Sequence, residues 1–447
     1  MNAPRPTRST SSAGSLLRDR VIGPLGVAQF ISAFGSAMVG LALVYLTYAR
    51  TGSVFRTVLV TAAYTLPAAV FSVSAGRLAQ HHSRRRILLV MYSMKGAVYT
   101  VAAVLEVTIG LGANALIAFS LINGVVAALS YPAWAAFERD VIPADQLDTA
   151  NAFFSSLSSA AQLVGAVGGG FLLGLIGAGL VFLLNALSYL PEMVVLFRLH
   201  PKERVDPTFT SHQHDLRRAI ATIRTDPLLR RGFRSLIAVS LLAAPLFQLL
   251  PAVAAEIDSG AHTLGILTAM VALGGTAVTW AMVRLRRRYE RRLIIAIGLS
   301  LTGATLVGFG ISNFFFDGDA LYPPVIAGLV VVGLTIGLGD SALSALVQSG
   351  APEELEGSIF AVYAIVYTAI GPLGALVLAQ AADHFDVYLL LAICGLILVA
   401  FGLTDRHPPG EHDMSEARRP LVGGLHLHGI LHRGMASHAR AASGAAR

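Results

Sequence analysis

Charged residues are scarce in this sequence. Only 13% of its 447 residues are Asp, Glu, Lys or Arg, whereas 55% are hydrophobic. A soluble domain averages about 25% charged residues, so most of the surface of this chain cannot face water. The single cysteine, Cys394, excludes a disulfide framework and a cysteine-based metal site. The sequence also lacks a phosphate-binding loop and a nucleophile–base–acid arrangement, which disfavours ATP-driven transport by this chain alone and an intramembrane enzyme.

The apolar residues stand in twelve long blocks that contain few charges. Most blocks have about 20 residues or more, the length that crosses about 30 Å of hydrocarbon at about 1.5 Å per helical residue. The sequence therefore predicts an all-α membrane protein with twelve transmembrane helices. The blocks cover residues 22–49, 54–76, 87–107, 112–136, 150–176, 178–197, 233–254, 262–283, 293–311, 323–348, 358–381 and 385–403.

Positive charge is plentiful but unevenly distributed. The formal net charge is +7, and 30 of the 33 lysine and arginine residues fall in segments that would lie on one side of the membrane. Arg50 and Arg56 fall on the other side, and Lys95 lies inside a block. Because cytoplasmic loops are enriched in Lys and Arg, this asymmetry predicts that both termini are cytoplasmic. It also explains the net positive charge of the chain without a nucleic-acid partner.

The composition predicts five segments along the chain. Residues 1–20 are rich in Ser, Arg and Pro, and we expect a disordered cytoplasmic N-terminus. Residues 198–232 form a central cytoplasmic loop between six blocks in 21–197 and six blocks in 233–403. Residues 404–447 form a polar cytoplasmic tail.

The two halves share a short internal repeat. Gly76-Arg77-Leu78 and Val283-Arg284-Leu285 stand at an offset of 207 residues, each in the loop after the second block of its half. Parallel repeats of this kind occur in secondary transporters. The repeat predicts two related six-helix bundles.

Several motifs resemble the major facilitator superfamily. The stretch Leu46–Ser53 is similar to the turn that ends the first span, and Tyr131-Pro132-Ala133 is similar to the end of span 4. The superfamily loop motif with its basic cluster corresponds to Gly76, Arg84, Arg85 and Arg86, and the span-5 antiporter motif corresponds to Gly165, Gly168 and Gly169. The closest resemblance is to enterobactin-exporter-like and macrolide-efflux-like drug:proton antiporters, over about residues 20–403.

The resemblance implies the major facilitator fold, with two six-helix bundles around a central cavity. It also implies a cytoplasmic gating loop at Gly76 and Arg84 to Arg86. The chain departs from the pattern at Gln80, which replaces the acid of the loop motif, at Ala166, which replaces the proline of the antiporter motif, and near Ser36, where many members have an acid. These departures leave open an importer or facilitator of the same fold.

Asp340 is the most prominent charge within a block. An ionisable group in hydrocarbon costs about 2.5–3.5 kcal/mol, so each one needs an explanation. Asp340 shares a helical face with Ser344 and Gln348, and the resemblance points this face into the central cavity. We expect a titrating carboxylate or a cation-binding site. The alternative is a charge near the cytoplasmic end that reaches water or an arginine.

Polar helical faces supply further candidates for the cavity. In lipid such faces turn toward other helices or water. Interhelical hydrogen bonds are the alternative explanation. Together with Asp340 and Ser344, the substrate-cavity and coupling candidates are Gln29, Ser36, Asn123, Tyr131 and Trp134.

Four other charged residues have simpler interpretations. We expect Glu192 to reach the interface or to pair with Arg198, and the long stem of Lys95 to reach the interface. Glu106 is expected at the outer interface, and Arg56 is expected to face water or headgroups.

These features predict a secondary active transporter that moves a small amphipathic organic compound, coupled to protons. The resemblance implies export of a compound such as a drug, siderophore or secondary metabolite. The expected partners are this substrate, protons and the lipid of a bacterial cytoplasmic membrane, and we expect a monomer with no cofactor and no metal site. A membrane sensor or scaffold that does not transport remains an alternative. The tail histidines are expected to be solvated, and they are His426, His428, His432 and His438.

Overall fold

The computed structural model describes residues 13–143, 145–199, 213–257, 260–285, 289–316 and 318–404. Every regular element within these ranges is a helix, as the apolar blocks predict. The predicted N-terminal segment up to residue 12, residues 200–212 of the central loop, and the tail from residue 405 with its four histidines lie outside the described residues.

The first group of helices comprises the elements from α2 to α7. A short helix, α1 (Ala13–Arg18), precedes it. Within the group, α2 packs against α6, α3 packs against α5, and α4 packs against both α5 and α6. Its members are α2 (Ile22–Thr51), α3 (Val54–His81), α4 (Arg84–Thr108), α5 (Ala113–Val141), α6 (Leu147–Ser188) and α7 (Leu190–Arg198).

The second group comprises the elements from α9 to α17 and follows α8 (Gln213–Thr225). Within it, α13 packs against α14 and α17, and α11 packs against α14. Short turns η1 (Gly318–Leu321), η2 (Glu353–Leu355) and η3 (Val366–Ile370) connect some of its helices. Its members are α9 (Pro227–Leu242), α10 (Pro245–Ile257), α11 (Ala261–Thr276), α12 (Val278–Leu285), α13 (Arg291–Phe315), α14 (Tyr322–Gly350), α15 (Glu356–Ile365), α16 (Gly371–Ala382) and α17 (Val387–Thr404).

Ten helical stretches among the described residues are long and apolar enough to cross a membrane, compared with twelve predicted blocks. The numbers differ at two places. Thr149–Arg198 counts once but has 50 residues, and Gly177 interrupts it with a positive φ of 76°. About 20 residues suffice for one crossing, so this stretch accommodates two spans. The eighth block is divided into α11 and α12, each too short to count alone.

Proline accounts for a further irregularity. The turn η3 is π-helical and leads directly into Gly371-Pro372 at the start of α16. Pro372 has no N–H to donate and its ring crowds the carbonyl one turn earlier, which disfavours regular α-helical bonding at this point. The eleventh apolar block, residues 358–381, extends across this break, and the structure divides it into α15, η3 and α16.

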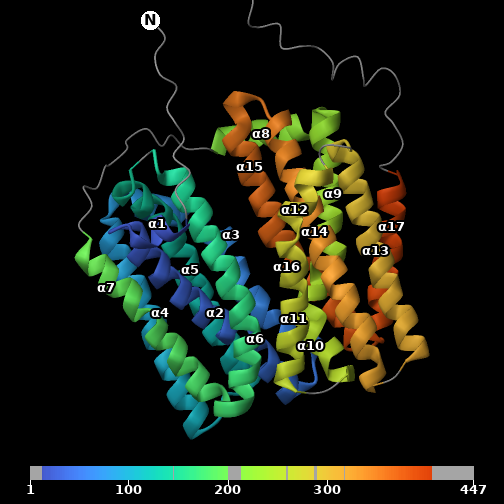
Figure 1. Ribbon diagram of the computed structural model, residues 1–447, viewed down its shortest axis with the longest axis horizontal. Coiled ribbons are helices and arrows are strands. Elements are labelled where there is room, and N and C mark those ends of the chain that lie inside the picture. Colours follow the sequence, from blue (N-terminus) through green and yellow to red (C-terminus); the bar gives the residue numbers. More distant parts are fainter. Residues whose placement is uncertain are drawn as a thin grey trace, which may run out of the picture. The chain divides into compact units, whose positions relative to one another are not determined.

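The two groups contact each other through a few helices (Figure 1). α6 packs against α11, and α3 packs against α10 and α16. Glycine makes the first contact close, because a Cβ atom built at Gly170 would lie 2.6 Å from the carbonyl oxygen of Ala261. Small residues allow membrane helices to approach in this way. The exact division into bundles at 21–197 and 233–403 stays a prediction, since all described residues belong to one compact unit that ends at Thr404.

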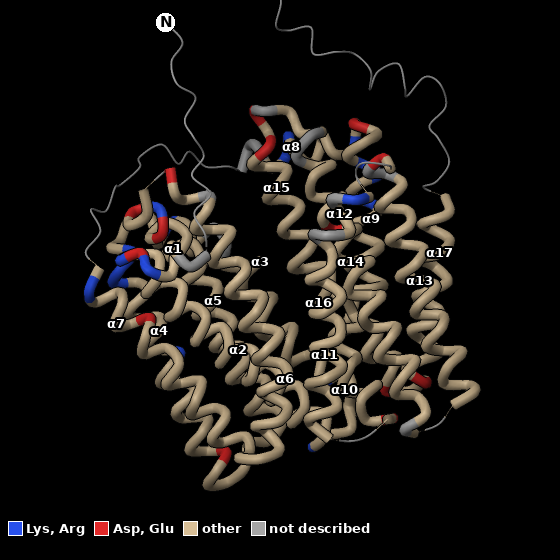
Figure 2. The backbone as a smooth tube through the Cα atoms, viewed as in Figure 1, with Lys and Arg blue, Asp and Glu red and all other residues tan. Residues whose placement is uncertain are grey.

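Charged side chains gather mainly at one end of the helices (Figure 2). This end carries the starts of α4 and α9 and the helix α8, and we call it the arginine-rich end. The opposite end carries Arg50, Glu106 and Asp383. The long apolar stretches lie between the two ends, as expected for segments surrounded by lipid.

Candidate functional site

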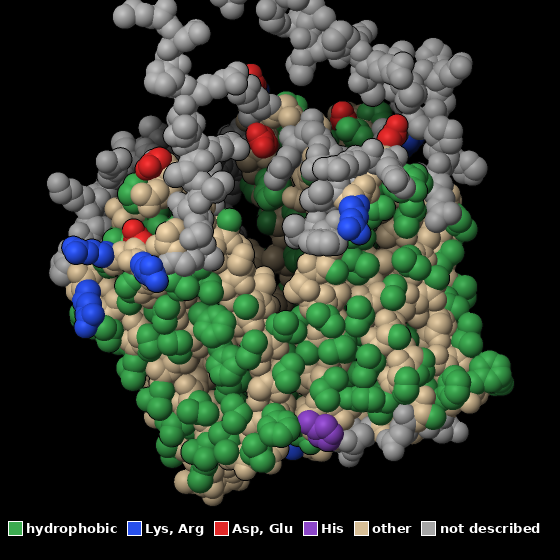
Figure 3. Space-filling view, in the orientation of Figure 1, with side chains coloured by type: hydrophobic (Ala, Val, Ile, Leu, Met, Phe, Trp, Pro, Cys, Tyr) green, Lys and Arg blue, Asp and Glu red, His purple; other side chains and the backbone are tan. Residues whose placement is uncertain are grey.

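A cavity of about 670 Å³ lies between the two groups of helices. Its wall comes from α2 to α6 in the first group and from α10 and α11 in the second. The molecular surface is hollowed between the two groups toward the arginine-rich end (Figure 3). Most of the wall is apolar, and its main polar side chains are Tyr64, Lys95, Tyr99, Asn123, Gln162 and Tyr189.

Two predicted candidates, Ser36 and Asn123, line this cavity. Asn123 is only 2% exposed, and its Nδ2 donates to the carbonyl of Phe119 at 2.9 Å. Its Oδ1 has no hydrogen-bond partner among the described residues. Such an orphaned acceptor is costly unless a ligand or water satisfies it.

Three other candidates do not belong to the cavity wall. Gln29 has a buried Oε1 without a partner in the described part of the chain. Tyr131 is 76% exposed. Trp134 donates its Nε1 hydrogen to Glu138 at 2.7 Å, and its ring meets that of Tyr92 edge-on at 6.2 Å. Its role is to extend the aromatic packing behind the wall.

Lys95 faces the cavity rather than the membrane interface. The expectation that its stem reaches the interface is wrong, because α4 begins at Arg84 and places Lys95 about three turns along the helix. Its Nζ lies 5.4 Å from the ring centroid of Tyr92 and 5.6 Å from that of Tyr189. The ammonium is therefore held by cation–π contacts in the middle of a span.

Tyr189 connects this lysine to α2. Its ring stacks on Tyr92 and Tyr99 with centroid distances of 6.1 Å and 6.4 Å. Its hydroxyl lies 3.2 Å from Oγ of Ser36 and accepts a 3.4 Å bond from Nδ2 of the buried Asn185. These bonds orient the ring that contacts Lys95.

Glu192 is buried inside the first group, with 4% exposure. The expectation that it reaches the interface or pairs with Arg198 is wrong: its Oε1 accepts a 2.6 Å bond from the hydroxyl of Ser32, and its Oε2 has no partner among the described residues. Pro191 lies in the first turn of α7 just before it, and α7 packs against α2. This packing turns the carboxylate inward.

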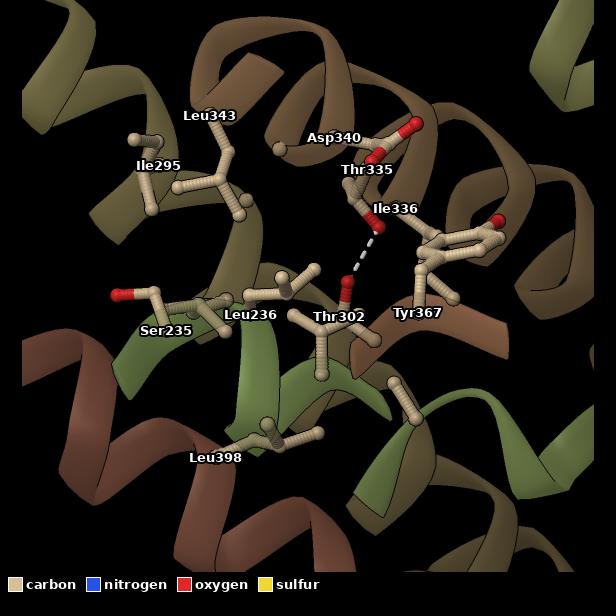
Figure 4. Close-up of a pocket in the computed structure, with 15 residues that line it drawn as sticks. Ser235, Leu236, Ile295, Thr302, Thr335, Ile336, Asp340, Leu343, Tyr367 and Leu398 are labelled. Carbon is tan, nitrogen blue, oxygen red and sulfur yellow. Dashed lines mark hydrogen bonds between the residues drawn. The ribbon is translucent and has the colours of Figure 1, made fainter. Parts of the chain in front are cut away.

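Asp340 lies in the second group, apart from the large cavity. It lines a cavity of about 30 Å³, room for a water-sized group, together with Tyr367 and the hydrogen-bonded pair Thr302 and Thr335 (Figure 4). The hydroxyl of Tyr363 on α15 donates to its carboxylate. Ser344, which the sequence places on the same face, lines none of the cavities described here.

The residues of the predicted gating loop differ in their contacts. Arg84 pairs with the buried Asp140 at the end of α5, and Arg85 donates to the carbonyls of Leu196 and Phe197 at 2.6 Å and 3.0 Å. Arg86 is exposed, and Gly76 has open space around it. Two arginines thus fasten α4 to α5 and α7.

The predicted glycine motif lies where α6 crosses α2. A Cβ atom at Gly165 would lie 2.7 Å from that of Ala37, and one at Gly169 would lie 2.8 Å from Cα of Met38. At Gly168 the nearest neighbour is the ring of Phe34, at 3.6 Å. Two of the three glycines are therefore needed for close helix packing.

The opposite end has its own charged contacts. Arg50 forms an ion pair with Glu106, which also accepts the N–H of Leu111 at 2.9 Å. Arg56 is exposed, as expected. Asp383 at the end of α16 accepts hydrogen bonds from residues at the start of α3.

The sequence alone predicts less specific roles for Lys95 and Glu192. One signal was available, since Tyr92, Lys95 and Tyr99 stand at i, i+3 and i+7 and therefore on one helical face. No such periodicity points to Glu192, whose partners lie on another helix. Among the described residues, no group of three His, Cys, Asp or Glu side chains could hold a metal ion.

Known proteins of similar sequence include efflux pumps. The chain is 21% identical over 393 residues to macrolide efflux protein A of Streptococcus pyogenes, covering 84% of this chain and 92% of that protein. It is 23% identical over 417 residues to the multidrug efflux pump Tap of Mycobacterium tuberculosis, covering 90% of this chain and 97% of the pump.

Solved transporter structures share the fold. A bacterial homologue of the iron transporter ferroportin in an inward-facing state aligns with a TM-score of 0.69 at 13% identity, covering 86% of this chain and 98% of that one. A mutant of the nucleoside transporter NupG aligns equally well at 0.69 and 12% identity, covering 87% of this chain and 100% of that one. The family model of the Major Facilitator Superfamily matches residues 25–375. The chain therefore belongs to the Major Facilitator Superfamily and is a multi-pass membrane transporter rather than an enzyme.

Proposed function

We propose that this transporter exports a small amphipathic organic compound across the cytoplasmic membrane by alternating access, with protons as the coupling ion. The observation that carries the proposal is the cavity of about 670 Å³, whose wall combines apolar, aromatic and polar side chains. Pockets of about 300–1,000 Å³ accommodate drug-sized ligands.

Orientation supports export. The positive-inside rule assigns the arginine-rich end to the cytoplasm. The surface is hollowed between the groups at that end (Figure 3), so a compound would enter the cavity from the cytoplasm. The two predicted bundles, 21–197 and 233–403, would rock about the cavity to release it on the other side. The efflux activities named for the two relatives agree with this direction.

Two carboxylates within the spans are candidates for proton coupling. Asp340 is bonded to Tyr363 in the second group, and Glu192 is bonded to Ser32 in the first group. A charged group within hydrocarbon costs about 2.5–3.5 kcal/mol, so a carboxylate kept there without a basic partner at bonding distance is a candidate for reversible protonation.

The test is substrate-dependent proton movement in inside-out vesicles. Vesicles with wild-type protein are energised by respiration, and a panel of lipophilic dyes and antibiotics is added while the internal pH is followed. Export predicts proton release on addition of a substrate. We expect Asp340→Asn or Glu192→Gln to abolish this release while leaving protein levels unchanged. Glu354→Gln, which alters an exposed carboxylate, is the control and should behave as wild type.

Other outcomes identify the alternatives. Transport that is indifferent to the gradient and to both substitutions indicates a facilitator. Uptake rather than extrusion in intact cells indicates an importer, a reading that Ala166 and Ser36 favour. A protein that moves no solute in liposomes would support a sensor or scaffold.

A further inference from the structure

The wall of the large cavity carries a single formal charge. Its lining residues, all within the described ranges, include one lysine, Lys95, and no aspartate, glutamate or arginine. A wall of this kind attracts anions and repels cations, and the effect is strong because low-dielectric surroundings screen charge poorly.

Lys95 forms no ion pair with another described side chain. The buried carboxylate of Glu192 lies outside the cavity wall and is bonded to Ser32. The aromatic rings of Tyr92 and Tyr189 hold the ammonium from the protein side. An ammonium has three donors, and cation–π contacts use none of them as hydrogen bonds.

The neighbouring wall suits the rest of a ligand. Tyr64, Tyr99 and Phe247 supply aromatic surface, and Phe247 reaches the cavity from the second group. The cavity therefore presents a cation and an aromatic surface.

We propose that the substrate is an organic anion, with a carboxylate, sulfonate or phosphate group on an aromatic or apolar body, and that Lys95 binds the anionic group. This inference rests on the proposed transport function and narrows its substrate class. The cytoplasm is electrically negative relative to the outside, which drives anions out of the cell. Export of such a compound is therefore favoured by the membrane potential itself.

The test compares two probes that differ by one charged group. Purified full-length protein in nanodiscs is titrated calorimetrically with 1-anilinonaphthalene-8-sulfonate and with N-phenyl-1-naphthylamine, which has the same rings without the sulfonate. Empty nanodiscs supply the background. We expect wild type to bind the sulfonate about tenfold more tightly than the neutral probe, the scale of one charge-assisted hydrogen bond.

Substitutions at Lys95 connect this preference to one residue. Lys95→Met keeps a side chain of similar length, so we expect it to lose the preference for the sulfonate while affinity for the neutral probe changes less than about twofold. Lys95→Arg should retain the preference. If Lys95→Met does not fold, the isosteric Asn123→Asp, which adds a negative charge to the wall, should weaken sulfonate binding about tenfold.

The results distinguish this inference from the proposed function. If the sulfonate binds equally well to wild type, Lys95→Met and Asn123→Asp, the inference is wrong. Transport of the sulfonate that is unchanged in Lys95→Met would also reject the inference while leaving export intact. Binding that depends on Lys95 without any transport in liposomes would support the anion site and reject export.

Discussion

The carboxylate of Asp383 at the end of α16 accepts the backbone N–H of Val54 at the start of α3, at 2.6 Å. It also accepts the hydroxyl of Ser53 at 2.8 Å and the N–H of Phe55 at 3.3 Å. The first N–H groups of a helix lack partners within the helix, and the helix dipole favours an anion at this position. One side chain of the second group thus caps a helix of the first group, at the end opposite the arginine-rich end.

Loss of this cap should favour opening of that end. Asp383→Asn removes the charge, and we expect separation of α3 and α16 to become easier by about 1.5–3 kcal/mol, the worth of hydrogen bonds to a charged group. Spin labels placed at the exposed positions Arg56 and Phe385, measured by pulsed electron resonance, should show a larger population at long distance.

Asp386 provides the matched control for this measurement. It lies close by in sequence but caps α17 within its own group, accepting the N–H of Leu389 at 2.8 Å. Asp386→Asn should leave the label distances unchanged. If Asp383→Asn also leaves them unchanged, the cap does not stabilise closure of this end.

Removal of the Ser32 hydroxyl should destabilise the first group. The hydroxyl donates to Oε1 of Glu192 at 2.6 Å, and the site is buried. Ser32→Ala should cost about 1–3 kcal/mol, because a buried carboxylate is left without this bond. Ser36→Ala, which loses a neutral contact with Tyr189, should cost about 0.5–1.5 kcal/mol.

Thermal unfolding in detergent measures both substitutions. Adding Glu192→Gln to Ser32→Ala should recover part of the loss, since residues in direct contact show non-additive effects. Equal destabilisation by Ser32→Ala and Ser36→Ala would contradict the prediction that the Ser32 hydroxyl stabilises the buried carboxylate of Glu192.

Glycine should be required where α6 meets α11. Gly170→Ala places a Cβ atom 2.6 Å from the carbonyl oxygen of Ala261, and we expect a loss of about 1–3 kcal/mol from overpacking together with reduced transport. Gly174 lies one turn further along α6 with nothing within 4 Å of its Cβ position. Gly174→Ala should stabilise by up to about 1 kcal/mol through helix propensity. If the unfolding temperature falls equally for Gly170→Ala and Gly174→Ala, the close approach of Gly170 to Ala261 is not the cause of the lost stability.

The three consecutive arginines of the loop motif should differ in importance. Arg84 and Asp140 have only 13% and 4% of their side chains exposed, so Arg84→Gln leaves a buried carboxylate unpaired and should cost about 3–5 kcal/mol. Arg86 is exposed, and Arg86→Gln should change stability by less than about 0.5 kcal/mol. Thermal unfolding of the two variants side by side tests this order, and a larger loss for Arg86→Gln would contradict it.

The sequence alone determined the membrane class and the positions of the spans. The bilayer dictates how many apolar residues a crossing helix needs, and this requirement is local, so it can be read from blocks such as 22–49 and 293–311. Local geometry also explains the irregular places, since Gly177 and Gly371-Pro372 interrupt helices through their own backbone properties. The position of Lys95 within its span, however, became clear only from the structure, which shows that α4 begins at Arg84.

Only the tertiary structure decided which polar groups meet. The candidates Ser36 and Asn123 came together on one cavity wall, whereas Asp340 was placed beside Tyr363 in the other group. The rotation of a membrane helix about its axis is set by packing against its neighbours, and a polar face alone does not say whether it turns toward a cavity or another helix. Glu192 shows this most clearly: its partner Ser32 is 160 residues away, and their contact depends on α7 packing against α2.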